Sequence, residues 1–336
     1  MATDPNEQLP HEHGVAEILQ PEGDQTAPAG AERIEFPWAD HVDDNWDAFD
    51  FTPYERFVDV LGRKLNIVEL GDPTKPVLLF VHGIMGTWRN WIFNLLPFAD
   101  RYRVIAVDLP GFGLSEMPAK PLTMQVYADT VAELIRTLDL KNVTYVGNSM
   151  GGQVGTIFAK QNPELLEKLV LVDAAGFSTS TRQTRRMSRF VPLAAPILAL
   201  GFVLRTLISR SRILSRIFTK IVLWRPANIP SELILVLLTG LGKPAFIPAA
   251  QSIFATPIKE VDGEVTTPTL IIWGRNDTLI PKRDAFKFMR MIPHADLRLI
   301  PDTGHIPMFE TPDQFNAIID EFAAAPAAAS ALSQAA

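Results

Sequence analysis

The stretch Gly147-Asn148-Ser149-Met150-Gly151 decides the fold, because it fits the pattern G-x-S-x-G and stands between an expected strand and an expected helix. It follows the apolar run Val143–Val146 directly and opens Met150–Gln161, a segment with a helical pattern. The glycines two residues before and after the serine leave room for a sharp turn from strand to helix. Such a turn lifts the hydroxyl out of a sheet, so we predict that Ser149 is a nucleophile.

Short apolar runs and helical patterns alternate on both sides of this stretch. Strands without polar residues are typical of a parallel sheet buried on both faces. The alternation therefore predicts an α/β fold with a mostly parallel, eight-stranded, doubly wound sheet. The expected strands are 57–60 and 65–70 (a hairpin around Gly62), 77–81, 104–108, 143–147, 169–173, 270–273 and 297–300, and the expected helices are 123–138, 150–161 and 312–322.

The alternation breaks once, between Asp173 and Leu270, where the chain is far longer than one crossover helix needs. We expect a helical cap insertion there. The predicted organisation is a disordered or loosely packed extension over 1–50, a core in two parts (51–177 and 259–322), the cap over 178–258, and a flexible tail over 323–336.

A base and an acid are expected at two further strand ends. His305 and Asp277 each follow a buried run, where open α/β sheets place their ligands. His305 is favoured because the other five histidines lie in unsuitable segments: His11, His13, His41, His82 and His294. A serine needs a base, and the base needs an acid to orient it. Asp173 competes with Asp277 as the acid, whereas Asp108 belongs to a tight turn.

The segment His82-Gly83-Ile84-Met85-Gly86 follows the expected strand 77–81 and predicts a loop that approaches a ligand closely. We expect the backbone N–H groups of Ile84 and Met150 to form an oxyanion hole. Without Ser149, the same segment would be interpreted as an ordinary glycine loop with His82 packed beneath it. The residues expected to contact substrate are His82, Gly83, Trp91 and Phe190.

Together these segments resemble the α/β-hydrolase superfamily over about residues 55–175 and 260–322. The resemblance implies a Ser–His–Asp triad, acyl-enzyme chemistry, no cofactor and no metal. The most similar branch includes esterases, lactonases, carbon–carbon bond hydrolases of ring-cleavage products and cofactor-free haloperoxidases. Haloalkane dehalogenases and epoxide hydrolases of this fold carry an Asp where Ser149 stands, which argues against both activities. The shared motifs are H-G-x-x-G (82–86), D-x-P-G-x-G-x-S (108–115), G-N-S-M-G-G (147–152), G-R-N-D (274–277) and G-H (304–305).

Composition argues against several kinds of site, partner and location. The chain of 336 residues contains no cysteine, which excludes disulfides and thiolate sites. A net charge of −7 argues against nucleic-acid binding. The first 33 residues lack the apolar run of a signal peptide, and no apolar run is long enough for a membrane span. We therefore expect a cytoplasmic protein.

Charge is distributed very unevenly, because residues 178–258 contain eleven Lys or Arg and a single acidic residue, Glu232. This segment carries a formal charge of +10. Since the whole chain has a net charge of −7, the remaining residues carry −17. Between Phe202 and Trp224, basic and apolar residues recur on separate helical faces, the pattern of a basic amphipathic helix. Three interpretations stay open: a solvated cap face, peripheral docking on an anionic membrane, or attraction of anionic apolar substrates.

The first functional hypothesis is hydrolysis of a carboxylic ester with an apolar acyl group, a small-molecule substrate. A second is cleavage of another acyl bond by the same residues: carbon–carbon, thioester, lactone or amide, or haloperoxidase-like chemistry. A third, a catalytically silent binding protein, is disfavoured because every triad position is filled. A fold alone does not fix a function.

Overall fold

The computed structural model describes residues 49–190, 212–226, 229, 231–237, 239–240 and 242–326. The predictions for most of the N-terminal extension (1–48), for residues 191–211 of the cap and for the end of the tail (327–336) lie outside these residues.

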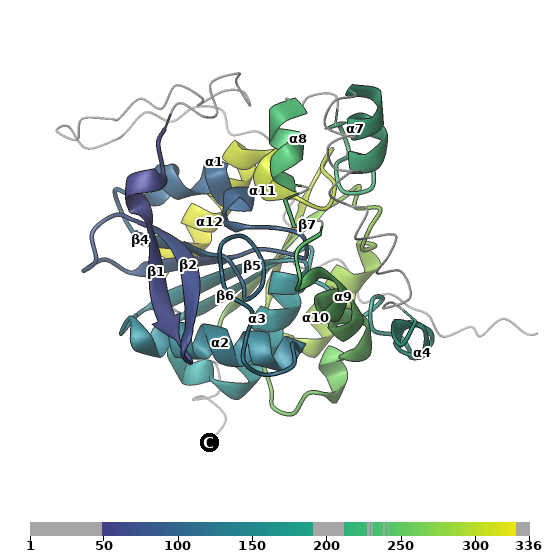
Figure 1. Ribbon diagram of the computed structural model, residues 1–336, viewed down its shortest axis with the longest axis horizontal. Coiled ribbons are helices and arrows are strands. Elements are labelled where there is room, and N and C mark those ends of the chain that lie inside the picture. The colour runs from purple at the N-terminus through teal and green to yellow at the C-terminus, as the bar shows by residue number, and fades with distance from the viewer. Residues whose placement is uncertain are drawn as a thin grey trace, which may run out of the picture.

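A single eight-stranded sheet crosses the molecule in the order β1-β2-β4-β3-β5-β6-β7-β8 (Figure 1). The first two strands form an antiparallel hairpin, β2 also runs antiparallel to β4, and all other neighbours are parallel. The doubly wound, mostly parallel sheet is the predicted one. Its strands are β1 (Glu55–Val60), β2 (Arg63–Leu70), β3 (Val77–Val81), β4 (Arg103–Val107), β5 (Val143–Asn148), β6 (Lys168–Val172), β7 (Thr269–Gly274) and β8 (Asp296–Ile300).

Two apolar cores cover the two faces of the sheet. One core packs α2 (Met124–Thr137), α3 (Met150–Gln161) and α10 (Arg283–Met291) against the sheet. The other packs the short helices α1 (Ile92–Leu95) and α11 (Pro307–Glu310) together with α12 (Pro312–Ala324) against the opposite face. Figure 1 shows these groups on opposite sides of the strands. The 3-10 helices are η1 (Thr52–Tyr54), η2 (Trp88–Trp91), η3 (Leu96–Phe98), η4 (Pro163–Leu165) and η7 (Ile258–Glu260).

Burial explains why the central strands are mostly apolar. Every residue of β3, β5, β6 and β7 is buried, because helices cover both faces at the centre of the sheet. The predicted helix start at Thr123 is also present: its side chain accepts a hydrogen bond from the Val126 N–H and caps α2. Helix α10 was not predicted, although its buried residues Asp284, Ala285 and Phe288 follow helical spacing.

Residues 178–258, which we call the cap segment, lie between β6 and β7 in sequence and contain four described α-helices joined by turns and loops. Their helices are α4 (Arg182–Ser188), α7 (Arg212–Thr219), α8 (Ser231–Leu237) and α9 (Phe246–Ala255). Helix α9 is tied to the core because the Ser252 hydroxyl accepts the N–H of Met124, the first residue of α2. We expected a basic amphipathic helix between Phe202 and Trp224. The structure describes this stretch from residue 212, where α7 begins, and the helix ends at Thr219.

Candidate active site

Ser149 occupies a strained turn between β5 and α3. Its backbone has φ 53° and ψ −112°, a left-handed conformation that a non-glycine residue adopts only when the surroundings enforce it. A Cβ added to Gly151 would lie 2.3 Å from the Val81 carbonyl oxygen, and one on Gly147 would lie 2.5 Å from the Gly151 carbonyl oxygen. Both glycines are therefore required sterically, and the sharp turn follows from their positions around the serine.

The glycine loop after β3 packs against this turn. A Cβ added to Gly83 would lie 3.0 Å from the Ser149 Cβ, so the loop backbone touches the candidate nucleophile. Neither the Ile84 N–H nor the Met150 N–H donates to a backbone acceptor elsewhere in the described residues. Met150 is the first residue of α3, where backbone N–H groups and the helix dipole favour negative charge. The two N–H groups are thus available to an oxyanion.

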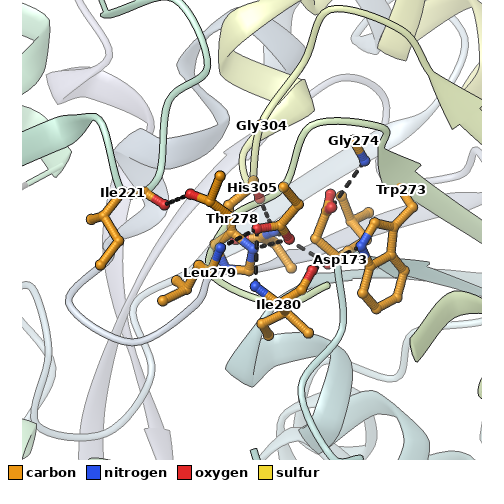
Figure 2. A network of polar contacts seen from close by, with 12 residues as sticks. Asp173, Ile221, Trp273, Gly274, Thr278, Leu279, Ile280, Gly304 and His305 are labelled. Carbon is orange, nitrogen blue, oxygen red and sulfur yellow. Dashed lines mark hydrogen bonds and ion pairs between the residues drawn. The ribbon is translucent and has the colours of Figure 1, made fainter. Parts of the chain in front are cut away.

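His305 and Asp277 form a buried pair at the ends of β8 and β7. His305 Nδ1 lies 2.7 Å from Asp277 Oδ2, and both side chains are almost fully buried. The other oxygen, Asp277 Oδ1, accepts the Leu279 N–H at 2.7 Å and the Ile280 N–H at 3.0 Å (Figure 2). The carboxylate is therefore fixed by three donors, and it orients the imidazole so that the opposite nitrogen is free to accept a proton.

That opposite nitrogen, His305 Nε2, is buried and has no hydrogen-bond partner among the described residues. The His305 loop is joined to the Ser149 turn through Asn148, whose side-chain N–H donates to the His305 carbonyl oxygen at 3.1 Å. A buried, unpaired imidazole nitrogen is costly in a protein interior. Here it suits a base that awaits the hydroxyl proton of a neighbouring serine.

Asp173, the competing acid, lies beside this pair but does not replace Asp277 in it. Its Oδ1 accepts the Gly274 N–H at 2.9 Å (Figure 2), whereas His305 Nδ1 pairs with Asp277. Burial, followed by the charge of Asp277, raises the pKa of Asp173 well above its ordinary value. Geometry thus favours Asp277 as the orienting acid.

Asp173, Asp277 and His305 also form a set of side chains of the kinds that bind metals, since one ligand atom of each lies within 4.8 Å of the others. The 2.7 Å separation between His305 Nδ1 and Asp277 Oδ2 is a hydrogen-bond distance, which leaves no room for an ion between these atoms. The donor set fits a proton-sharing pair rather than a metal site.

Of the four expected substrate contacts, only Gly83 is brought against Ser149. His82 is fully buried, its Nε2 accepts the Leu109 N–H, and its Nδ1 therefore donates to the Gly83 carbonyl oxygen. Burial lowers the pKa of His82, which keeps this ring neutral. The ring supports the loop and is not presented to a ligand, which corrects the expectation of substrate contact.

Trp91 needs the same correction, whereas substrate contact by Phe190 stays a prediction. Trp91 is fully buried in the core, with its ring centroid 5.0 Å from that of Phe80 and 6.2 Å from that of Phe315. Its spacing from Trp88 within one helical turn was a signal of a buried face. Phe190 follows α4, is 57% exposed and contacts Arg189. Neither ring has a described contact with Ser149 or His305.

Sequence reasoning missed a connection between the catalytic loops and the cap segment. The His305 N–H donates to the Val222 carbonyl oxygen at 2.9 Å, and the hydroxyl of Thr278, next to Asp277, donates to the Ile221 carbonyl oxygen at 3.1 Å. On the oxyanion side, the Gly240 N–H donates to the Met85 carbonyl oxygen at 2.8 Å. Backbone atoms of the cap segment therefore bind the His305 loop, the loop after β7 and the glycine loop.

Glu310 also connects the His305 loop to the cap segment, because its carboxylate binds backbone N–H groups of both. One carboxylate oxygen accepts the Gly304 N–H at 2.7 Å, and the other accepts the Trp224 N–H at 2.7 Å and the Arg225 N–H at 3.2 Å. Burial raises the pKa of Glu310, although these three backbone donors oppose that shift. No local pattern identifies such a residue, because its partners come from distant parts of the chain.

Comparison with known proteins identifies the family and supports the fold. An uncharacterized protein of Mycobacterium tuberculosis is 29% identical over 261 residues, which cover 74% of this chain and 75% of that protein. The 2-hydroxy-6-oxo-6-phenylhexa-2,4-dienoate hydrolase of Comamonas testosteroni is 29% identical over 249 residues, covering 70% and 82% of the two chains. The crystal structure of a putative lipase from Acinetobacter baumannii AYE is similar with a TM-score of 0.66 and 23% identity, covering 83% and 92%.

The family model described as "alpha/beta hydrolase fold" matches residues 76–312, a range that contains the serine turn, the glycine loop and the Asp277–His305 pair. The match spans well over half of the chain and includes every candidate catalytic residue. The chain is therefore an enzyme of the α/β-hydrolase family.

Proposed function

We propose that this enzyme is a serine hydrolase that cleaves a carboxylic ester with an apolar acyl group through an acyl-enzyme. The observation that carries the proposal is the His305 ring, which is bound at Nδ1 by Asp277 and is free at Nε2 beside the strained Ser149 turn. An imidazole held in this way accepts the proton of a serine hydroxyl as the hydroxyl attacks a carbonyl.

The proposed reaction has two halves. Ser149 Oγ bonds to the carbonyl carbon while its proton moves to His305 Nε2, and the N–H groups of Ile84 and Met150 stabilise the oxyanion. The ester C–O bond then breaks, and the leaving alkoxide takes the proton from His305. Water next attacks the acyl-enzyme, its proton passes through His305 back to Ser149, and the acid is released.

The contact between the cap segment and the oxyanion loop supports an apolar acyl group. A Cβ added to Gly240 would overlap the backbone of Met85, so the cap backbone lies directly on this loop. Met85, Val222 and Phe246 are partly buried and pack against the same apolar core. A carbonyl bound at Ile84 and Met150 therefore has apolar side chains of the loop and the cap segment nearby, which favours an apolar substituent.

Carbon–carbon bond hydrolysis is the second candidate, since the relative from Comamonas testosteroni, at 29% identity, is named as a hydrolase of 2-hydroxy-6-oxo-6-phenylhexa-2,4-dienoate. The same serine, base and oxyanion donors serve either bond, as they would a thioester, lactone or amide. The two candidates differ in the leaving group, which is an alkoxide for an ester and a carbon acid for carbon–carbon cleavage. Assays with an ester and with a ring-cleavage product therefore distinguish the two activities.

We also propose that the cap segment docks on an anionic membrane surface. Helix α7 exposes apolar side chains to solvent, with Ile213 at 72% and Ile217 at 67%, and Ile221 just beyond it is exposed as well. The segment carries +10, so apolar contact and charge attraction would act together. Within the described residues, no helix has the length and apolarity to cross a bilayer.

The docking proposal predicts that Ile217→Glu weakens binding to vesicles of anionic phospholipid in a flotation assay. Leu61→Glu is the matched control, because Leu61 is similarly exposed but lies in the β1–β2 turn. Equal binding of both variants, or preference for neutral vesicles, would contradict docking through α7.

The test of the esterase proposal is a series of p-nitrophenyl esters from acetyl to palmitoyl, assayed with wild type and Ser149→Ala. We expect hydrolysis by wild type alone, with the highest kcat/KM for an acyl chain longer than acetyl. Activity on a ring-cleavage product without ester hydrolysis would favour the carbon–carbon candidate. An equally active Ser149→Ala variant would exclude both.

A further inference from the structure

A second carboxyl group lies beside the Asp277–His305 pair. Asp173 follows β6, which pairs directly with β7, and Asp277 comes soon after β7. One side-chain atom each of Asp173, Asp277 and His305 lies within 4.8 Å of the other two, and all three residues are buried. Two acids and one base therefore share a single desolvated site.

The hydrogen bonds of this site leave one oxygen without a donor. Asp173 Oδ1 accepts the Gly274 N–H, whereas the buried Oδ2 accepts no hydrogen bond from any described residue. Both oxygens of Asp277 are already bound, by the Leu279 and Ile280 N–H groups and by His305. An ionised Asp173 would thus keep a buried negative oxygen that faces another carboxylate, which is a costly arrangement.

The surrounding charges make ionisation of Asp173 still less favourable. The charged groups that raise its pKa are the acids Asp277 and Glu310. Burial foremost, then the charge of Asp277, raises the pKa of Asp173 well above its usual range. A proton on Asp173 turns the unbound Oδ2 into a donor for the neighbouring Asp277 carboxylate.

We propose that Asp173 is a positioning residue, which remains a neutral carboxylic acid and donates a hydrogen bond to the Asp277 carboxylate so that Asp277 stays aligned with His305. This inference rests on the proposed hydrolase function. Asp173 does not transfer its proton during the reaction. It fixes the orientation of the Asp277 carboxylate, and it leaves a single negative charge to stabilise the imidazolium formed when Ser149 attacks.

The test compares two substitutions of Asp173. In Asp173→Asn the amide oxygen accepts the Gly274 N–H and the amide N–H donates to Asp277, as the neutral acid does. In Asp173→Ala the donor is lost. We expect Asp173→Ala to lower kcat roughly 10- to 100-fold with little change in KM, the range for losing one hydrogen bond to a charged group. Asp173→Asn should recover most of that loss.

The pH profile gives a readout that a purely structural role would not change. Wild type should lose kcat at alkaline pH as Asp173 ionises beside Asp277, and Asp173→Asn should lack this loss. Urea unfolding of both variants separates misfolding from mispositioning. The proposal is overturned if folded Asp173→Ala keeps wild-type kcat, or if Asp173→Asn is as impaired as Asp173→Ala.

Infrared spectroscopy tests the proton on Asp173 without any substrate. We expect the carbonyl stretching band of a buried, protonated carboxyl group in wild type at neutral pH, and its disappearance in Asp173→Asn. The same band in both proteins would contradict the assignment. Failure of the proposed function is distinguished by a fluorophosphonate probe: if Ser149 of wild type does not react, the hydrolase proposal fails whatever the infrared result.

Discussion

The substitution Asp277→Asn isolates the contribution of the orienting acid. Asparagine keeps an oxygen that can accept the Leu279 and Ile280 N–H groups, so the loop after β7 should retain its conformation. The amide nitrogen, however, replaces the oxygen that lies 2.7 Å from His305 Nδ1. Two donors would then face each other, and the ring can avoid this only by moving its proton to Nε2.

With the proton on Nε2, His305 cannot accept the hydroxyl proton of Ser149. In hydrolases with this arrangement, the exchange of the acid for its amide lowers kcat by about 10⁴-fold, or about 5 kcal/mol of transition-state stabilisation. Since Asp277 is buried behind His305, away from the expected carbonyl position, we expect KM to change by less than about threefold.

The assay is steady-state hydrolysis of the best p-nitrophenyl ester at neutral pH. The matched control is Asp284→Asn, because Asp284 is also a buried aspartate that accepts a backbone N–H, that of Ser178, but lies on α10 and contacts Lys287. The control should lose stability and keep kcat. A loss below about tenfold in Asp277→Asn would refute the role of Asp277 as the orienting acid.

Three further predictions follow from described contacts. Gly151→Ala places a Cβ 2.3 Å from the Val81 carbonyl oxygen, so urea denaturation should show a loss of about 3 kcal/mol in the free energy of unfolding. Glu310→Gln leaves one oxygen to accept the backbone donors of the His305 loop and the cap segment, so kcat should fall roughly tenfold in the ester assay while vesicle binding persists. Folding raises the pKa of Asp173, so its contribution to stability is fully present below about pH 4 and is lost as pH rises through the folded-state pKa. In urea titrations, wild type should therefore lose stability relative to Asp173→Asn as the pH rises above about 4, and a constant difference would contradict a raised pKa.

Local patterns were sufficient for the sheet and for the pairing of Asp277 with His305. Each central strand is a mostly apolar run because both its faces are covered, so composition alone located β3, β5, β6 and β7. Ser149, Asp277 and His305 each directly follow such a run or come within a few residues of it, and parallel strand order brings these ends together.

The substrate contacts could not be predicted in the same way, because they depend on burial. His82 and Trp91 lie near the glycine loop in sequence, yet the fold turns His82 into the loop and Trp91 into the core. Glu310 and Val222 were missed for a related reason: their bonds to the His305 loop join segments that the sequence alone does not place side by side.

The central claim is that Ser149 forms an acyl-enzyme, and intact-protein mass spectrometry tests it most directly. A reaction with a p-nitrophenyl ester, or with a fluorophosphonate, is quenched in acid, and the modified peptide is identified after proteolysis. We predict an adduct of the acyl or phosphonyl mass on Ser149 in wild type and none in Ser149→Ala. Ester turnover without an adduct on Ser149, or turnover that persists in Ser149→Ala, would contradict the claim.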